Sequence, residues 1–457
     1  MLSPYLDVLS IPGARQFTAW GVLARIQMGM TGLATFLLVQ MEYGSYELAG
    51  MVLASIAISY ATLAPIVARL IDTHGQSRVL RISYAIAITG RIAMVVAALT
   101  GQPIWVLMAL APTFAAVGSQ ATLTRARWTH AVKNREQLNT AFSLETSLEE
   151  VLFIMGPVMT TILATQVASW LPPVIAVVTM AVGGYMFLTL KETEPPVKQR
   201  SSDVGLTEAA LALSPTTAAG GIALPHVTAA SARRRRSYRN PFAGHLLVTS
   251  PTLAITVVVF MTQGMLFASV DASTVAFASE KGQPALAGLV LAVWAFGSLV
   301  GGVLYGSRVW HSSLATRLLI GVSFAGLGVS TFMFAPSLVM LGAVMFIAGL
   351  VIAPTMVVGD SLVNAAIARG RVTEGMTWTR TGIDIGIALG AWLTGAQIDA
   401  HGAQGGFTVT MLAGLAGIVI VLSGWRYIRR QPRLEEDYGH RVEPRAVATP
   451  ASATMEA

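Results

Sequence analysis

Long apolar stretches recur along the whole chain, and each is followed by a short polar segment. A helix needs about 20 mainly apolar residues to cross a bilayer, and twelve stretches reach that length, six on each side of a long polar segment. The predicted spans are 17–40, 47–69, 79–99, 103–123, 138–165, 170–190, 247–272, 285–306, 315–335, 338–360, 374–398 and 406–428. The pattern predicts an all-α membrane protein with twelve transmembrane helices.

The positions of the basic residues support this count. If the N-terminus is cytoplasmic, nearly all of the 30 Lys and Arg fall in cytoplasmic segments, as the positive-inside rule requires. Only Lys281 falls in an outside loop, and Arg25 and Arg91 fall within spans. A missing or invented span would destroy this asymmetry. We therefore expect a multi-pass protein of the cytoplasmic membrane, without a cleavable signal peptide and with both termini in the cytoplasm.

Composition narrows the class of protein further. Hydrophobic residues make up 54% and charged residues 12%, whereas a soluble domain carries about 25% charge, so a soluble enzyme and a disordered chain are excluded. Cysteine is absent, which excludes disulfides and thiolate metal sites. The seven His lack metal-ligand spacing and no phosphate-binding loop occurs. We expect no metal, no cofactor and no enzyme activity. The net charge of +7 is attributed to cytoplasmic loops rather than to nucleic-acid binding.

The polar segments divide the chain into four parts. Residues 1–190 and 245–430 are expected to form two six-helix bundles, joined by a basic cytoplasmic linker at 191–244 and followed by a disordered tail at 431–457. The linker contains an Arg run at 233–236. That run either binds anionic lipid or orients the span that follows it.

The loop after the second span carries a recognisable motif. Residues 68–78 read Ala-Arg-Leu-Ile-Asp-Thr-His-Gly-Gln-Ser-Arg. This resembles the signature Gly-x-Leu-x-Asp-Arg-x-Gly-Arg-Arg/Lys-Arg/Lys of the major facilitator superfamily, with matches at Leu70, Asp72, Gly75 and Arg78. Gly156-Pro157 in span 5 resembles a second element of that family. The six-plus-six arrangement of spans agrees with both.

The resemblance implies two pseudo-symmetric bundles that transport a solute by alternating access, with a site between them. It also implies that Asp72, Gly75 and Arg78 form a cytoplasmic latch, weakened here by the missing basic positions. The equivalent loop of the second half has Gly306 in place of the acid. Ile-Asp-x-His-Gly recurs at 398–402, but at the outside end of span 11, and we interpret it as a coincidence or shared ancestral turn rather than a second latch.

Ionisable side chains within the spans are functional candidates, because charge is costly in the bilayer. In span 5, Glu145 and Glu149 share a helix face and Glu150 points about 100° away. Arg25 in span 1 has a similar depth, and we predict that it pairs with Glu149 or Glu150. The acid left over would face the cavity and, since desolvation disfavours its charge, would carry a proton. The alternative is a closed ion cluster that only fixes helix packing.

The second half offers counterparts at the same depth. Arg380 and Asp384 are four apart and can pair along their helix. They either belong to the functional site or form a salt bridge near the cytoplasmic rim. Aligning the halves places Glu150 on Asp384, Thr146 on Arg380 and Arg25 on Gln263. The candidates for substrate binding or proton coupling are therefore Arg25, Gln27, Glu145, Glu149, Glu150, Gln263, Arg380 and Asp384.

Three further groups of residues leave alternatives open. Arg91 either pairs with an acid of a neighbouring span, which we favour, or binds an anion. Trp294 and Trp378 lie deep in their spans and either stack on substrate or pack in the core. Other Trp residues near span ends are expected to anchor the membrane interface: Trp20, Trp128, Trp170, Trp310 and Trp425.

The expected function is secondary transport of a small organic solute by a monomer in the lipid bilayer. Proton coupling is expected, and efflux is slightly favoured because the spans are mostly apolar. Span 4 lacks the Arg that drug/proton antiporters of the family carry, which weakens that specific interpretation. Uptake of a sugar, amino acid or organic anion remains open, as does a receptor or scaffold that does not transport.

Overall fold

The computed structural model describes residues 3–117, 120–132, 134–194, 246–308, 310–367 and 371–429, so most of the linker and the whole tail lie outside the described residues. All regular elements within them are helical. The N-terminal half comprises α1 (Ser3–Leu9), α2 (Ala14–Tyr43), α3 (Tyr46–His74), α4 (Gln76–Leu99), α5 (Ile104–Leu110), η1 (Ala111–Val117), α6 (Gln120–Ala131), α7 (Arg135–Gln166), α8 (Leu171–Thr189) and η2 (Lys191–Thr193). The C-terminal half comprises α10 (Leu246–Thr249), α11 (Pro251–Glu280), η4 (Pro284–Leu286), α12 (Ala287–Gly306), α13 (Leu314–Ser330), η5 (Phe332–Phe334), α14 (Leu338–Gly349), α15 (Ile352–Ala366), α16 (Val372–Ser423) and α17 (Trp425–Arg429).

Eleven helical segments of the described chain are long and apolar enough to cross a membrane. The difference from the twelve predicted spans lies in α16, whose 52 residues would be about 78 Å long as one straight helix, far more than a bilayer needs. Gly402 interrupts it with φ 69° and ψ −166°. The chain folds back there, as shown by Gly405, which lies so close to Gln397 that a Cβ on it would collide with the Gln397 carbonyl oxygen. The element therefore contains predicted spans 11 and 12 as a helical hairpin.

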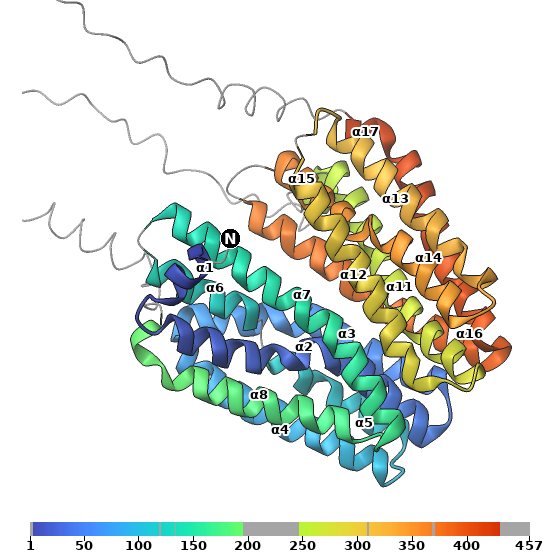
Figure 1. The fold of residues 1–457 in the computed structure, drawn as a ribbon, viewed down its shortest axis with the longest axis horizontal. Helices are drawn as coiled ribbons and strands as arrows, with labels where there is room; N and C mark the ends of the chain where they lie inside the picture. Colours follow the sequence, from blue (N-terminus) through green and yellow to red (C-terminus); the bar gives the residue numbers. More distant parts are fainter. Residues whose placement is uncertain are drawn as a thin grey trace, which may run out of the picture.

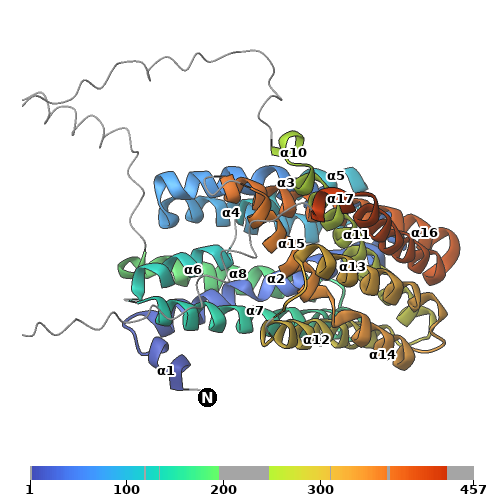
Figure 2. The same ribbon diagram turned by 90° about the horizontal axis from the view of Figure 1, so that it is seen from above.

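The two halves lie side by side, close together at one end and apart at the other (Figure 1). The end where they diverge is the end at which the chain leaves the N-terminal half after Glu194 and enters the C-terminal half at Leu246. We call it the linker end and the opposite one the far end. Two seams join the halves: α3 packs on α16, and α7 packs on α12 (Figure 2).

Small residues let the backbones touch at both seams, and the contacts lie toward the far end. A Cβ on Gly50 of α3 would collide with the backbone of Ala391 in α16, and one on Gly395 would collide with that of Tyr46. On the other seam, a Cβ on Gly288 of α12 would meet the carbonyl of Pro157 in α7. Close approach of this kind is how helices associate within lipid.

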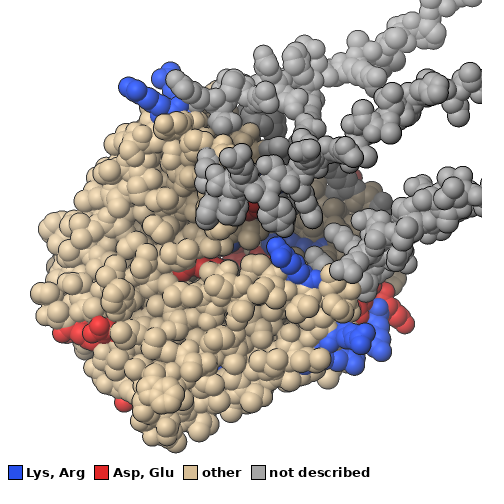
Figure 3. Space-filling view, turned by 180° about the vertical axis from the view of Figure 1, so that it is seen from behind, with Lys and Arg blue, Asp and Glu red and all other residues tan. Residues whose placement is uncertain are grey.

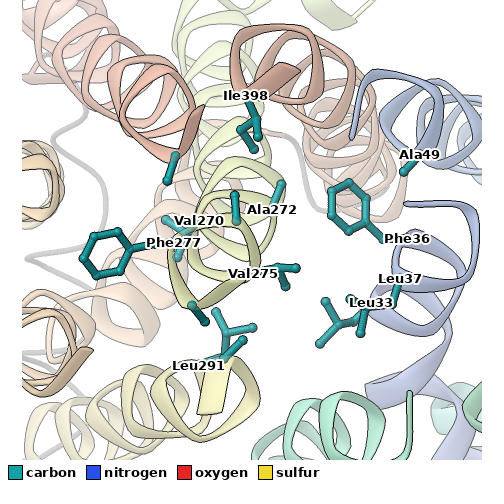
Figure 4. Close-up of a cluster of buried hydrophobic side chains, with 14 of the residues drawn as sticks. Leu33, Phe36, Leu37, Ala49, Val270, Ala272, Val275, Phe277, Leu291 and Ile398 are labelled. Carbon is teal, nitrogen blue, oxygen red and sulfur yellow. The ribbon is translucent and has the colours of Figure 1, made fainter. Parts of the chain in front are cut away.

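An apolar cluster from both halves fills the space between these seams. Leu33, Phe36 and Leu37 of α2 lie in one buried cluster with Val275 of α11 and Leu291 of α12 (Figure 4). Each of these side chains is at most 7% exposed. The far end is thus closed by interlocking apolar side chains.

A crevice separates the halves toward the linker end. Figure 3, which views the molecule from behind, shows acidic and basic side chains inside this crevice, while the other charged side chains visible on this face lie toward its edges. The structure is therefore closed at the far end and open at the linker end. Two spans beside the crevice are discontinuous, as transporter helices near a binding site often are: α5, η1 and α6 form the fourth span, and α14 and α15 form the tenth.

Candidate functional site

A buried ion cluster joins α2 to α7 in the N-terminal half. The Arg25 guanidinium forms an ion pair with Glu145, and both side chains are completely buried. Its Nη1 also donates to Glu149 Oε1 at 3.0 Å, and its Nε donates to the Gly21 carbonyl at 3.1 Å. The predicted pair of Arg25 with Glu149 or Glu150 is confirmed at Glu149, and the shared helix face of the two glutamates lets Arg25 bind both.

Two residues of α6 complete the cluster, and the sequence did not indicate this role for either of them. Trp128 Nε1 donates to Glu145 Oε1 at 2.7 Å, and Arg125 Nη2 donates to Glu149 Oε2 at 3.0 Å. Trp128 is fully buried, so its prediction as an interfacial anchor is wrong. The positive charges of Arg25 and Arg125 are thus balanced by the negative charges of Glu145 and Glu149. This balance explains how four charges are accommodated within a membrane span, since buried charges are stable only when paired and hydrogen-bonded.

Glycine packing between α2 and α7 sets the position of the cluster. A Cβ on Gly29 would collide with the Leu152 carbonyl, and one on Gly156 would collide with the backbone of Gly29. The two helices therefore touch about one turn from Arg25. That approach places the guanidinium within reach of both glutamates on the facing side of α7.

Glu150 remains outside the cluster. It is half-buried in the middle of α7, and no hydrogen bond or ion pair joins it to another described residue. It lies seven and eleven residues before Pro157 and Thr161, so all three share one helix face. The hydroxyl of Thr161 on that face accepts a hydrogen bond from the Gly288 N–H of α12 at 3.2 Å. Glu150 therefore lies on the side of α7 that is turned toward the opposite half.

Arg91 of α4 has neutral partners, contrary to the favoured prediction that it pairs with an acid. Its Nη1 donates to Gln27 Oε1 at 2.7 Å and its Nη2 to the Tyr60 hydroxyl at 3.4 Å. The guanidinium also lies over the Phe114 ring, 4.8 Å from its centroid. In the described part of the chain no carboxylate pairs with it. Glu145 and Glu149 of α7 are engaged by Arg25 and Arg125 instead, and Gln27 serves as a hydrogen-bond acceptor for Arg91 rather than as a free cavity residue.

The C-terminal half has an ion pair between α15 and α16, but its partners differ from those predicted. Arg380 Nη2 of α16 donates to Asp360 Oδ2 of α15 at 3.2 Å. The expected pair of Arg380 and Asp384 within one helix is not among the ion pairs of the described residues. The reason is geometric, because α15 packs beside α16 and presents Asp360 at the depth of Arg380.

The remaining candidates of this half differ in burial. Gln263, the counterpart of Arg25, is 2% exposed, and its Oε1 has no hydrogen-bond partner among the described residues. Trp294 is buried between Phe267 and Phe332, with ring centroids 6.1 and 6.5 Å away, so it belongs to the apolar core rather than to a substrate-stacking surface. Trp378 and Asp384 are half-buried on α16. The deep charged cluster thus exists in the N-terminal half alone among the residues described.

Comparison with known families decides the identity of the fold. The sequence model of the Major Facilitator Superfamily matches residues 20–317. The chain belongs to this superfamily. Comparison with curated protein sequences gives no match.

Solved structures of superfamily transporters are similar in fold. The nucleoside transporter NupG has a TM-score of 0.64 at 14% identity, over 91% of this chain and 98% of that one. A D-xylose-proton symporter gives 0.63 at 13% identity, over 90% and 97%. A peptide transporter, POT, in complex with sulfate gives 0.63 at 16% identity, over 92% and 95%. Membership of the superfamily makes this chain a multi-pass membrane protein and not an enzyme, and the similar structures show that it has a transporter fold.

The superfamily signature loop joins α3 to α4 at the linker end. Gly75 has φ 88°, a backbone conformation that favours glycine, and it forms the turn between the two helices. Asp72 lies in the last turn of α3, but its side chain lies outside the described residues, and Arg78 is exposed, so their part in a latch stays a prediction. The sequence missed the partner of this loop: Glu194, after η2, accepts a hydrogen bond from the Ser77 N–H at 2.8 Å.

At the far end the repeated Ile-Asp-x-His-Gly segment joins the two halves through Asp399, a contact that the sequence did not indicate. Asp399 of α16 accepts hydrogen bonds from the Ser45 hydroxyl at 2.6 Å and from the Tyr46 and Glu47 N–H groups at 2.9 Å each. These N–H groups begin α3. A carboxylate at a helix N-terminus is stabilised by the unpaired N–H groups and by the helix dipole. The far-end closure thus includes a charged cap as well as the apolar cluster.

Proposed function

We propose that the chain is a proton-coupled secondary transporter that moves a small organic solute across the cytoplasmic membrane as a monomer. The observation that carries the coupling is Glu150, a half-buried carboxyl without a partner among the described residues, beside a cluster in which every charge is paired. A carboxyl that has no cation beside it can gain and lose a proton without breaking an ion pair, whereas Glu145 and Glu149 cannot.

Position supports the same role. Glu150 lies on the α7 face turned toward α12, so its surroundings change whenever the halves move relative to one another. A proton bound in one arrangement can then be released in the other. One of the structurally similar proteins, the D-xylose-proton symporter, uses protons. Gln263, Asp384 and the Arg380–Asp360 pair are proposed to complete the polar surface of the crevice in the opposite half.

The linker end is proposed to face the cytoplasm, because the basic residues gather there. Efflux of an amphipathic compound is slightly favoured by the apolar character of the spans. Uptake of a sugar, amino acid or organic anion is the second candidate, supported by the nucleoside, xylose and peptide transporters among the similar folds.

The test uses the purified chain in liposomes with and without an imposed pH gradient, screened across labelled solutes. For any solute that moves, Glu150→Gln should abolish the response to the pH gradient while leaving exchange of solute in place. Glu136→Gln, an exposed acid at the start of the same helix, is the matched control and should leave coupling unchanged. Unchanged coupling in Glu150→Gln would exclude this carboxyl, and absence of flux for every solute class would favour a receptor.

A further inference from the structure

One cation in the N-terminal half is buried without an anion beside it. Arg91 is 3% exposed and lies eight residues before the end of α4, which corresponds to about 12 Å of helix. Its hydrogen bonds go to the neutral groups of Gln27, Tyr60 and Met180, and its Nε has no hydrogen-bond partner within the described chain. The equally buried Arg25, by contrast, is held by two glutamates. Arg91 therefore carries a positive charge that no acid of the described residues neutralises.

A lone charge at this depth is costly. Neutral oxygens and the ring of Phe114, whose centroid is 4.8 Å from the guanidinium, lower the cost but leave the positive charge in place. Charged side chains within membrane spans almost always pair with an opposite charge or lie on a path for ions. Since none of the described carboxylates pairs with Arg91, an anion from solution is the remaining way to neutralise it.

Space for one small particle lies beside this guanidinium. Helices α2, α4 and α8 and the short η1 line a cavity of about 10 Å³, which is close to the smallest space that holds one water molecule. Arg91 contributes to its wall, as do the hydroxyl-bearing Thr31 and Thr35, and the other lining residues are apolar. Thr31 donates its proton to Gln27. The hydroxyl of Thr35 and the Nε–H of Arg91 remain as donors for an occupant.

The cavity extends from the middle of the bundle toward the far end. On α2 its wall runs from Thr31 to Leu38, five residues before the end of that helix, and on α8 it includes Pro173, in the first turn. Both of these helix ends lie at the far end (Figure 1). This end faces the outside in the proposed orientation, so the outside medium is the nearest source of an ion.

We propose that Arg91 and Thr35 bind one chloride-sized anion inside the N-terminal bundle. The anion neutralises the guanidinium and accepts hydrogen bonds from the Arg91 Nε–H and the Thr35 hydroxyl. A water molecule would satisfy these donors but would leave the charge without a counterion. The space is too small for an organic carboxylate, so the occupant is an inorganic ion rather than part of a solute. The site is separate from Glu150, and its occupation does not depend on transport.

The dependence of stability on chloride tests the site, since a ligand that binds only the folded protein stabilises it as its concentration rises. The purified full-length chain is unfolded by heat in detergent, in sodium chloride and sodium gluconate mixed at constant ionic strength. The unfolding temperature of the parent should rise as chloride replaces gluconate. Equilibrium binding of radioactive chloride to the same preparation should saturate at one ion per chain.

Three variants assign the response to this site. Arg91→Gln removes the charge and should abolish both chloride binding and the chloride dependence of the unfolding temperature. Thr35→Val keeps the shape and the charge of the site but removes the hydroxyl, so it should weaken chloride binding several-fold, and it keeps the proposal testable if Arg91→Gln does not fold. Arg81→Gln, an exposed change on the same helix, is the matched control and should respond as the parent does.

The outcomes separate the possible occupants. A parent that does not respond to chloride would show that the cavity holds only water, and a response unchanged in Arg91→Gln and Thr35→Val would place the ion elsewhere; either result overturns the site. Stabilisation by sodium acetate but not by sodium chloride would overturn the assignment to a halide-sized ion and indicate a carboxylate. None of these measurements uses solute flux or a pH gradient, so the anion site and the proposed transport can fail independently.

Discussion

At the scale of single residues, the clearest feature is a charge cluster that is complete without any ligand. Arg25, Glu145 and Trp128 are fully buried and satisfy one another, and Glu149 links them to the more exposed Arg125. Such a cluster is expected to matter for stability, whereas the unpartnered Glu150 beside it is available for function. The sequence placed all three glutamates within the bilayer, but only the structure divided them between the cluster and the helix face outside it.

We expect the losses of stability caused by substitutions of Arg25 and Glu145 to be coupled. Glu145→Gln leaves the buried Arg25 with a single anion that it must share with Arg125, and should lower the free energy of unfolding by about 3 kcal/mol. Arg25→Gln combined with Glu145→Gln removes both charges and should cost clearly less than the two single changes added together. Thermal unfolding in detergent measures all three variants.

Glu136→Gln, exposed on the same helix, should leave the unfolding temperature unchanged. Strict additivity of the two single substitutions would show that Arg25 and Glu145 are not energetically coupled, and would contradict the role of the cluster in stability.

At the scale of helices, position along the bundle is set by glycines. The contact between α2 and α7 occurs where Gly29 and Gly156 face each other, and this contact fixes the reach of Arg25. At the seams between the halves, the helices likewise touch at glycines, namely Gly50, Gly288 and Gly395. A sequence rich in glycine indicates close packing in general, but it does not tell which glycine touches which backbone.

Two glycines of α2 allow this to be tested with a matched control. Gly29→Ala should separate α2 from α7, because the added methyl group meets the Leu152 carbonyl. We expect a loss of about 1–3 kcal/mol, typical of overpacking. Gly32→Ala lies one turn away with nothing within 4 Å of its Cβ, and should be neutral or slightly stabilising. Equal unfolding temperatures for the two variants would contradict the assigned contact.

At the scale of the whole molecule, closure at the far end is held by an apolar cluster and by one carboxylate. Asp399 crosses from one half to the other and caps the first turn of α3. Because these hydrogen bonds must break when the far end opens, they stabilise the arrangement described here over its alternative.

Removal of this cap should therefore shift the population toward opening of the far end. Asp399→Ala loses the hydrogen bonds from Ser45, Tyr46 and Glu47, and we expect the closed arrangement to lose about 1–3 kcal/mol. A single cysteine at Val275, in the apolar cluster, would report opening through its rate of labelling by a membrane-impermeant maleimide. That rate should rise at least several-fold.

Gln397→Ala, an exposed change on the same turn of α16, is the control and should leave labelling slow. Labelling that is equally slow in Asp399→Ala would mean that the apolar cluster alone closes the far end.

The sequence by itself determined the class of molecule. The length of the apolar stretches and the one-sided distribution of Lys and Arg predicted twelve spans, and the motif at 68–78 predicted the family. These features can be read from short segments of sequence, without knowing how distant segments pack. The pair of Arg25 and Glu149 was also predictable, since helix periodicity and depth leave few partners for a charge in lipid.

Only the tertiary structure decided the choice among equivalent partners. Arg380 pairs with Asp360 rather than Asp384, Arg91 binds Gln27 and Tyr60 instead of an acid, and Asp399 caps a helix of the other half. Each of these contacts joins residues from different helices, and their distances depend on which small residues let two backbones meet. Local pattern sets where a side chain lies along its own helix, but the packing of neighbouring helices sets what it touches.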